Sequence, residues 1–353
     1  MDQPTSSDRS TTRTILLVAL GIPLIALIAW GGIAVTGLIT PPPPVEAETP
    51  VEEIDSAIDA ASQYLNENKP ATARTILASA IEKWPEDQRL CLLFGETMLQ
   101  LALTTEDPDA AREYKLDALR QYNQAIVIGP EHPEHHHAAG MIAEDLGRLE
   151  DAAAHFAKAQ MMAPSSAKYP LYLGHTLSKL GRHAEAKKNL LLAANLDPES
   201  GVAWASIAGI ELDENNLDIA LSMIRRAREL EPYRTDWRII EARVLRRQNH
   251  PEQALDLLLA APEAARYGSG PMLFEVASCY GMLNQPGDAA ALYVEAASRR
   301  PDDAEIQYQC AVWLERDGRA DRAVAYCERA SALGHADAAR WLERRAATST
   351  STN

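Results

Sequence analysis

Three small residues recur along the chain at a spacing of about 34 residues, in eight consecutive blocks. Position 8 of the blocks is Ala61, Gly95, Gly140, Gly174, Ala208, Ala242, Ala277 and Ala311. Position 20 is Ala73, Ala118, Ala152, Ala186, Ala220, Ala254, Ala289 and Ala323, and position 27 is Ala80, Ala125, Ala159, Ala193, Ala227, Ala261, Ala296 and Ala330. This period predicts a stack of antiparallel helix pairs with one continuous core, because a single pair cannot bury its apolar face alone.

Each block contains two stretches with helical character. In the third block they run from Glu134 to Leu146 and from Leu149 to Met162, with a short turn at Gly147. Ala and Gly at the recurring positions let two helix axes approach closely. A proline cannot continue the second helix, and it closes six of the blocks, at Pro85, Pro130, Pro164, Pro198, Pro232 and Pro301.

The segments 203–232 (AWASIAGIELDENNLDIALSMIRRARELEP) and 137–164 (HAAGMIAEDLGRLEDAAAHFAKAQMMAP) carry this pattern most clearly. The pattern resembles the tetratricopeptide repeat family, which has Trp, Leu, Gly and Tyr on its first helix and Ala, Phe, Ala and Pro on its second. The resemblance implies an all-α, right-handed superhelical solenoid of eight repeats over residues 54–337. It also implies binding of protein partners in a concave groove rather than catalysis.

Three blocks depart from the pattern. The second has about eleven extra residues near Thr104 to Arg112, either in its helices or in the turn between them. The sixth has one extra residue, and Pro262 replaces its closing proline. The last ends in ALGHADAARWLERR, which is similar to Sel1-type repeats. We expect a capping helix over residues 338–347 and a disordered tail over 348–353.

Residues 15–39 contain no charged side chain. As a helix they would be roughly 37 Å long, enough to cross a bilayer. Arg9 and Arg13 precede this segment, and no Lys or Arg follows before Lys69. The positive-inside rule therefore predicts a single-pass membrane protein with disordered residues 1–14 in the cytoplasm and the repeats on the far side of the membrane. The compact layout of an anchor followed by repeats favours the bacterial inner membrane, which places the repeats in the periplasm. Residues 40–53 form a Pro- and Glu-rich linker. The alternative is a signal peptide cleaved after Ala47.

The chain has a formal net charge of −16, which argues against a nucleic-acid partner. No nucleophile elbow, phosphate-binding loop or zinc-protease motif occurs in the sequence. We therefore predict a protein that is not an enzyme, with no catalytic residue, no cofactor and no small-molecule substrate. The histidines at 132, 135, 136 and 137 point in different directions on a helix, so we predict no metal site there.

An arginine cluster and several apolar side chains are the candidates for partner binding. Arg243, Arg246 and Arg247 belong to a run of eight arginines between 225 and 247. Either they hold carboxylates of a partner, or they pair with nearby Glu229, Glu231, Asp236 and Glu241. The resemblance places five further residues in the groove: Leu171, Tyr172, His175, Phe274 and Tyr308.

Cys310 and Cys327 lie on facing helices of the last block. Two alternatives are open for them: a disulfide in an oxidising compartment, or two buried free thiols.

The layout resembles that of bacterial anchored repeat proteins that assemble envelope complexes or mature cytochromes. We therefore predict a membrane-anchored scaffold or adaptor for an envelope assembly or biogenesis complex, with peptide segments of protein partners bound in the groove. The alternative is a general chaperone-like binder of exported unfolded chains.

Overall fold

The structure is a computed structural model that describes residues 50–350, and every regular element in this range is an α-helix. The all-α solenoid predicted from the repeat is thus confirmed for this part of the chain; its right-handed turn stays a prediction. The predicted membrane segment 15–39, residues 1–14 and most of the linker lie outside the described residues. None of the described helices is long and apolar enough to span a bilayer.

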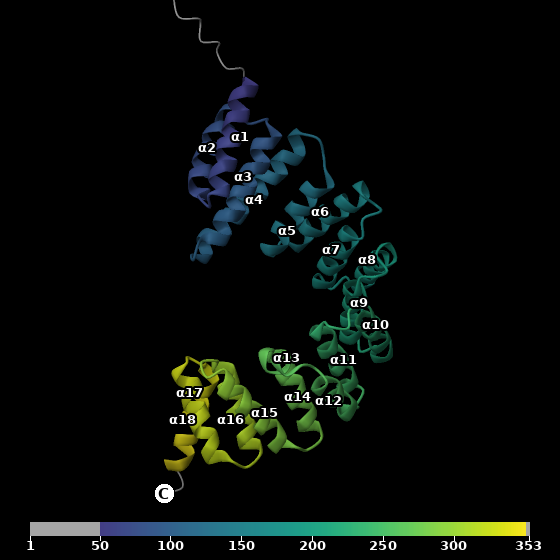
Figure 1. Ribbon diagram of the computed structural model, residues 1–353, viewed down its shortest axis with the longest axis vertical. Coiled ribbons are helices and arrows are strands. Elements are labelled where there is room, and N and C mark those ends of the chain that lie inside the picture. Colours follow the sequence, from purple (N-terminus) through teal and green to yellow (C-terminus); the bar gives the residue numbers. More distant parts are fainter. Residues whose placement is uncertain (1–49, 351–353) are drawn as a thin grey trace, which may run out of the picture. The chain divides into compact units, whose positions relative to one another are not determined.

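The helices form eight consecutive antiparallel pairs, in which we call the first member the A helix and the second the B helix (Figure 1). The A helices are α1 (Pro50–Asn66), α3 (Gln88–Thr104), α5 (Pro133–Asp145), α7 (Lys168–Lys179), α9 (Gly201–Asp213), α11 (Thr235–Arg247), α14 (Gly270–Met282) and α16 (Ala304–Arg316). The B helices are α2 (Pro70–Lys83), α4 (Pro108–Ile128), α6 (Leu149–Met162), α8 (His183–Leu196), α10 (Leu217–Leu230), α12 (Pro251–Leu259), α15 (Pro286–Arg299) and α17 (Ala320–Ala332). Each B helix also packs against the A helix of the next pair, so the pairs join into one stack.

The small residues lie where helices touch, and all 24 of them are buried. A Cβ atom added to Gly140 would lie 2.7 Å from the ring of Phe156, and one added to Gly174 would lie 2.6 Å from Leu190. Both distances are far below normal contact, so a larger residue would push the A and B helices of those pairs apart.

The turn within most pairs needs a residue in the left-handed conformation. Glycine fills this place at Gly147, Gly181 and Gly318, and asparagine fills it at Asn68, Asn215, Asn249 and Asn284, all with φ between 56° and 76°. These two residue types adopt that conformation at the lowest cost. In the third pair the Arg148 amide donates to the Ala143 carbonyl at 2.8 Å, which closes the end of the A helix.

The extra residues of the second block lengthen its helices and not the turn. Helix α3 has 17 residues and α4 has 21, against 13 and 14 in the third pair. The sixth pair differs in the opposite sense, because α12 has only nine residues and a short helix, α13 (Glu263–Gly268), follows Pro262. Arg266 donates to the carbonyls of Leu259 (2.7 Å) and Ala261 (3.2 Å), which closes the end of the shortened helix.

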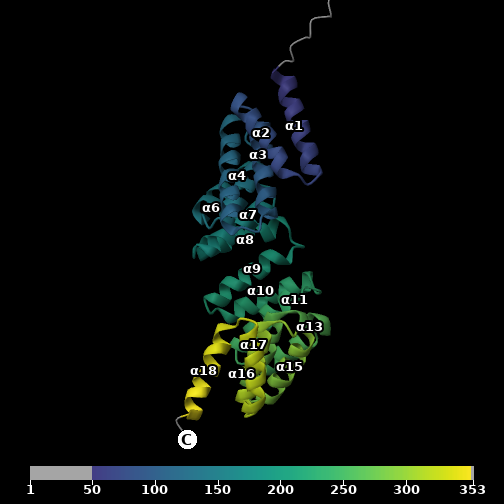
Figure 2. The ribbon, with the colours of Figure 1, turned by 90° about the vertical axis from the view of Figure 1, so that its left-hand side faces the viewer.

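Both ends of the repeat unit differ from the sequence-based boundaries. Helix α1 begins at Pro50 and not at 54, because proline fits the first helical position and Glu52 and Glu53 favour a helix N-terminus. At the other end α18 (Ala336–Thr350) packs on α17 (Figure 2). It runs past the expected limit at 347, since no Gly or Pro follows Gly334.

The core is less uniform than the repeat predicts. Its two largest clusters of buried apolar side chains lie in residues 98–210 and 239–338. Between them, at the contact of α10 with α11, Glu241 is 2% exposed. Its carboxylate lies 3.0 Å from Nε of Arg225 and 2.6 Å from Nε of Arg228. At this junction a buried ion pair therefore accompanies the apolar packing of Ile224 and Ala227 against Trp237.

Candidate functional site

Three cavities lie along the A helices of the stack. The α3–α5 pocket has a volume of about 540 Å³ and includes Arg89, Leu92 and His137. The α7–α9 pocket, of about 350 Å³, includes Leu171 and Tyr172. The α11–α16 pocket, of about 430 Å³, is lined by Arg243, Gly270, Pro271, Leu273, Phe274, Tyr293, Glu305, Ile306 and Gln309. Each combines apolar side chains with at least one cation and one carboxylate, a lining that suits peptide segments.

The α11–α16 pocket brings together two of the residues that the sequence singles out. Phe274 on α14 is 52% exposed, which is unusual for a phenylalanine, and Arg243 on α11 lines the same pocket. Glu305 on the opposite wall is already engaged, because it accepts hydrogen bonds from Gln309 (2.8 Å) and His335 (2.9 Å). The lining of the pocket thus includes an exposed aromatic ring and a guanidinium.

A buried carboxylate holds the arginines at this pocket. Glu275 is 1% exposed and accepts hydrogen bonds from Nε of Arg243 at 2.7 Å and from Nε of Arg246 at 3.0 Å. One negative charge therefore offsets part of the positive charge of two guanidiniums. The sequence analysis did not identify Glu275, although it follows the two arginines by 32 and 29 residues, close to one repeat.

The remaining arginines of the cluster make internal contacts. Arg247 donates to the Leu212 carbonyl at 2.6 Å, which ties α11 to α9. Four others pair with the glutamates that the sequence offers: Arg225 and Arg228 with Glu241, Arg226 with Glu229, and Arg234 with Glu231. Local pairing therefore accounts for much of the cluster, and of the three candidate arginines only Arg243 lines a pocket.

The other candidate residues separate into two groups. Leu171 and Tyr172 line the α7–α9 pocket together, and the ring of Tyr172 stacks on Phe156 at 5.5 Å. His175 instead bonds Ser206 Oγ at 2.6 Å, and Tyr308 stacks on His335 at 4.4 Å. His175 thus joins α7 to α9, Tyr308 packs on the turn before α18, and both residues line none of the three pockets.

Ion pairs link equivalent positions of adjacent A helices. Arg89 Nη1 lies 2.7 Å from Asp55 Oδ1, and Lys168 Nζ lies 2.8 Å from Glu134 Oε2. In both cases the partners are 34 residues apart. Opposite charges at one repeat spacing are a signal that would have found these pairs. They leave fewer free charges for a partner along the A helices.

The histidine group lies at the junction of the second and third pairs. The Nδ1 atoms of His136 and His155 are 3.3 Å apart, so one ring donates a hydrogen to the other. Burial lowers the pKa of both side chains, and it also lowers the pKa of His135 and His137. Within residues 50–350 no three His, Cys, Asp or Glu side chains are arranged to hold a metal ion. These histidines are neutral packing groups near neutral pH.

All four cysteines are buried free thiols. The disulfide considered for Cys310 and Cys327 is not formed, and Cys327 Sγ instead approaches the Ala338 carbonyl on α18 at 3.7 Å. Burial raises the pKa of Cys310 to about 12 and that of Cys327 to about 11. Both thiols therefore stay protonated and unreactive in the folded protein.

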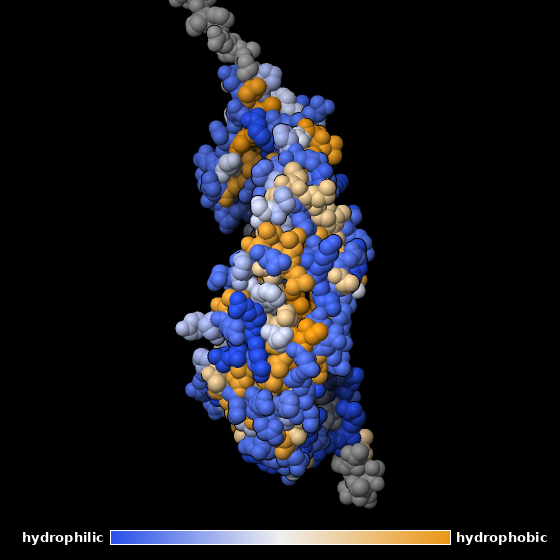
Figure 3. Space-filling model, turned by 90° about the vertical axis from the view of Figure 1, so that its right-hand side faces the viewer, coloured by the Kyte–Doolittle hydropathy of each residue, from blue (hydrophilic) through white to orange (hydrophobic). Residues whose placement is uncertain are grey.

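Apolar side chains also reach the surface on B helices. The exposed examples are Met161 (77%), Leu191 (44%), Leu192 (37%) and Ile219 (48%). Figure 3 shows the side of the molecule that lies to the right in Figure 1, where apolar residues are interspersed with hydrophilic ones. These four residues lie outside the three pockets, and nothing in the described part of the chain shows what would cover them.

The geometry defines a helical repeat scaffold with binding pockets along one set of helices. Models of the tetratricopeptide repeat match residues 97–167, 282–338 and 173–200. These matched segments therefore carry tetratricopeptide repeats, a class of repeat that typically binds proteins and is not catalytic. A comparison with curated protein sequences gives no significant match.

Two solved structures share the fold over most of the chain. Yeast Tom70 is similar with a TM-score of 0.57 and 17% identity, covering 86% of this chain and 66% of Tom70. A tetratricopeptide repeat protein from Parabacteroides merdae has a TM-score of 0.54 and 13% identity, covering 74% of this chain and 99% of that protein. At these identities the likeness concerns the fold alone.

Proposed function

We propose that the chain is a scaffold that binds peptide segments of protein partners along its A helices. The observation that carries this proposal is the α11–α16 pocket, whose lining includes both half-exposed Phe274 and Arg243. An exposed aromatic ring beside a guanidinium is the composition typical of a binding hot spot. A partner would place an apolar side chain over Phe274 and a carboxylate near the terminal nitrogens of Arg243.

The α7–α9 pocket offers a second anchoring point. Leu171 and Tyr172 provide its apolar wall, and Lys168 and Asp197 provide opposite charges at its edge. Several small pockets in a row suit an extended or helical peptide better than a single compact ligand. Multiple weak contacts along one surface then add to a useful affinity.

We also propose that residues 15–39 anchor the scaffold in a bacterial inner membrane, with the repeats in the periplasm, where it serves an envelope assembly or biogenesis complex. The absence of charge in this segment and the arginines before it support the proposal. The intact mass of the protein recovered from membranes tests it, since loss of residues 1–47 would contradict the anchor. The Sel1-like character of the last repeat likewise stays a prediction.

Crosslinking and capture from membranes test the binding proposal. The double variant Phe274→Ala, Arg243→Gln should lower partner recovery about tenfold, as expected when a hot spot is removed. The matched control is Tyr233→Ala, because Tyr233 is 97% exposed and lines none of the three pockets. Equal recovery with the double variant and the control would contradict the proposal. Recovery of many partners in place of one stoichiometric partner would instead favour a general chaperone.

A further inference from the structure

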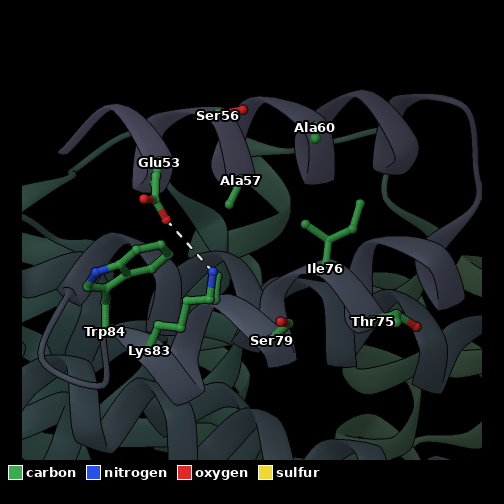
Figure 4. Close-up of a pocket in the computed structure, with 10 residues that line it drawn as sticks. Glu53, Ser56, Ala57, Ala60, Thr75, Ile76, Ser79, Lys83 and Trp84 are labelled. Carbon is green, nitrogen blue, oxygen red and sulfur yellow. Dashed lines mark ion pairs between the residues drawn. The ribbon is translucent and has the colours of Figure 1, made fainter. Parts of the chain in front are cut away.

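The first helix pair has an open groove in the place where later pairs are covered. Between α1 and α2 lies a cavity of about 580 Å³, with Ala57 and Ala60 on one wall and Ile76 and Ser79 on the other (Figure 4). In each later pair within residues 88–332, the preceding B helix packs against the A helix. Ala139, which corresponds to Ala60 in the third pair, is fully buried, whereas Ala60 is half-exposed. Within residues 50–350 no B helix precedes α1, and the groove has the form of a site for one more helix.

Small side chains make up most of the exposed surface of α2 before its last two residues. Its exposed side chains before Glu82 are Ala71, Thr72, Arg74, Thr75, Ala78 and Ser79, of which only Arg74 is charged. Small residues let a second helix approach closely, as they do at the contacts inside the stack.

Opposite charges stand on the two sides of the groove. Glu53 on α1 and Lys83 on α2 point toward each other, with Lys83 Nζ 3.7 Å from Glu53 Oε2 (Figure 4). Their side chains are 40% and 61% exposed, so both can take other partners. A surface with one charge of each sign on facing walls is complementary to a second copy of itself related by a two-fold axis.

We propose that two copies of this chain associate through the groove of the first pair. The α2 helix of each copy lies in the groove of the other, so that the helices form two staggered layers. Lys83 of each copy then faces Glu53 of the other, which gives two equivalent ion pairs across the axis. This interface lies on the first pair, apart from the α7–α9 and α11–α16 pockets, and goes beyond the proposed peptide binding.

A cysteine at the proposed axis tests the geometry. Ser79 is exposed and lines the groove, and Ser222 on α10 is an equally exposed control away from it. The four native cysteines are buried and give no background. In the full chain, in mild detergent with a weak oxidant, Ser79→Cys should form a disulfide-linked dimer and Ser222→Cys should not. Equal crosslinking of the two variants would overturn the proposal.

Charge reversal tests the pairing of Glu53 with Lys83. Glu53→Lys alone and Lys83→Glu alone each place like charges opposite one another twice, so each should raise the dimer dissociation constant about tenfold. A mixture of the two variants restores both pairs in a heterodimer, which differently tagged copies reveal by co-purification. Circular dichroism verifies that each variant is folded. A wild-type chain that sediments as a monomer at about 100 μM, or single variants that dimerise as well as wild type, would overturn the proposal.

Discussion

The carboxylate of Glu275 accepts a hydrogen bond from Nε of Arg243 at 2.7 Å, across the contact between α14 and α11. The acid is 1% exposed, whereas the arginine side chain is 42% exposed. The pair therefore joins the interior of the stack to the surface of the α11–α16 pocket. Arg246 shares the same carboxylate, so this single buried group fixes two arginines on the neighbouring helix.

Removing the charge of Glu275 should destabilise the stack. In Glu275→Gln both arginines lose their anionic partner, and we expect a loss of about 1–3 kcal/mol in unfolding free energy. The penalty stays below that of a fully buried pair because the arginines can turn toward water. Urea denaturation followed by circular dichroism measures it. Glu295→Gln is the control, since Glu295 is 48% exposed and its loss should cost less than about 0.5 kcal/mol.

Two helical glycines should respond oppositely to alanine. A Cβ at Gly140 would lie 2.7 Å from Phe156, so Gly140→Ala should cost about 1–3 kcal/mol. A Cβ at Gly209, within α9, would meet no atom within 4 Å. Gly209→Ala should therefore stabilise the helix by about 0.5–1 kcal/mol. Thermal melting of both variants checks the contrast. A similar loss in the two variants would refute close packing as the reason for Gly140.

Because His136 and His155 are buried, we expect the free energy of unfolding to decrease in mild acid. Burial lowers the pKa of His136 and His155 in the folded protein below the unfolded value. The unfolded chain therefore binds more protons between these values, and stability rises with pH in that range. Stability should be complete above about pH 6.5 and should fall as the pH drops from there. For His136, Glu131 raises the pKa and Lys158 lowers it further. For His155, Asp151 raises the pKa and Arg148 lowers it further. The two acids therefore reduce the pH dependence, and the two cations increase it.

Urea midpoints at pH 7.5 and pH 5 measure this dependence. His155→Asn should reduce the difference between the two midpoints, because it removes one of the two facing rings. His250→Asn is the control, since that side chain is exposed in the turn before α12. An unchanged pH dependence in His155→Asn would show that other groups cause it.

The four cysteine thiols should not react with alkylating reagents in the folded protein. We expect no labelling of the native protein by a maleimide at pH 8, because all four thiols are buried and the pKa of Cys310 and of Cys327 is raised. Labelling after denaturation without reductant should reach all four. Labelling of only two would show that Cys310 and Cys327 form a disulfide in the purified protein.

The repeat made the helix pairs predictable from sequence. Small residues at fixed spacing specify where helices touch, and Gly or Asn at one place in every block except the second specifies the turn. The place of the extra residues in the second block could not be predicted from the repeat, because they fit equally well in a longer turn or in longer helices. Apolar packing along α3 and α4 decides between these, through contacts such as that of Leu119 with the core.

The candidate site was less predictable, because a side chain's partner decides its role. Arg243 and Arg246 bond the same buried acid and Arg247 bonds a carbonyl of α9, yet Arg243 alone among the three lines one of the described pockets. The position of a residue in the repeat predicts which face of the helix it lies on. It does not predict which hydrogen-bond acceptor its side chain will bind. A search for opposite charges one repeat apart would have identified Glu275 and the Asp55–Arg89 pair.

Helix α18, which follows α17, covers the C-terminal end of the stack, so the two ends of the repeat array differ in whether a further repeat could pack on them. With Ala338 buried and Trp341 bonded to Glu315 on α16, α18 occupies the surface on which another repeat would sit. An engineer who wished to lengthen the scaffold would have to remove that helix to add a unit after it. A unit grafted before Pro50 would instead meet a surface already shaped to receive one.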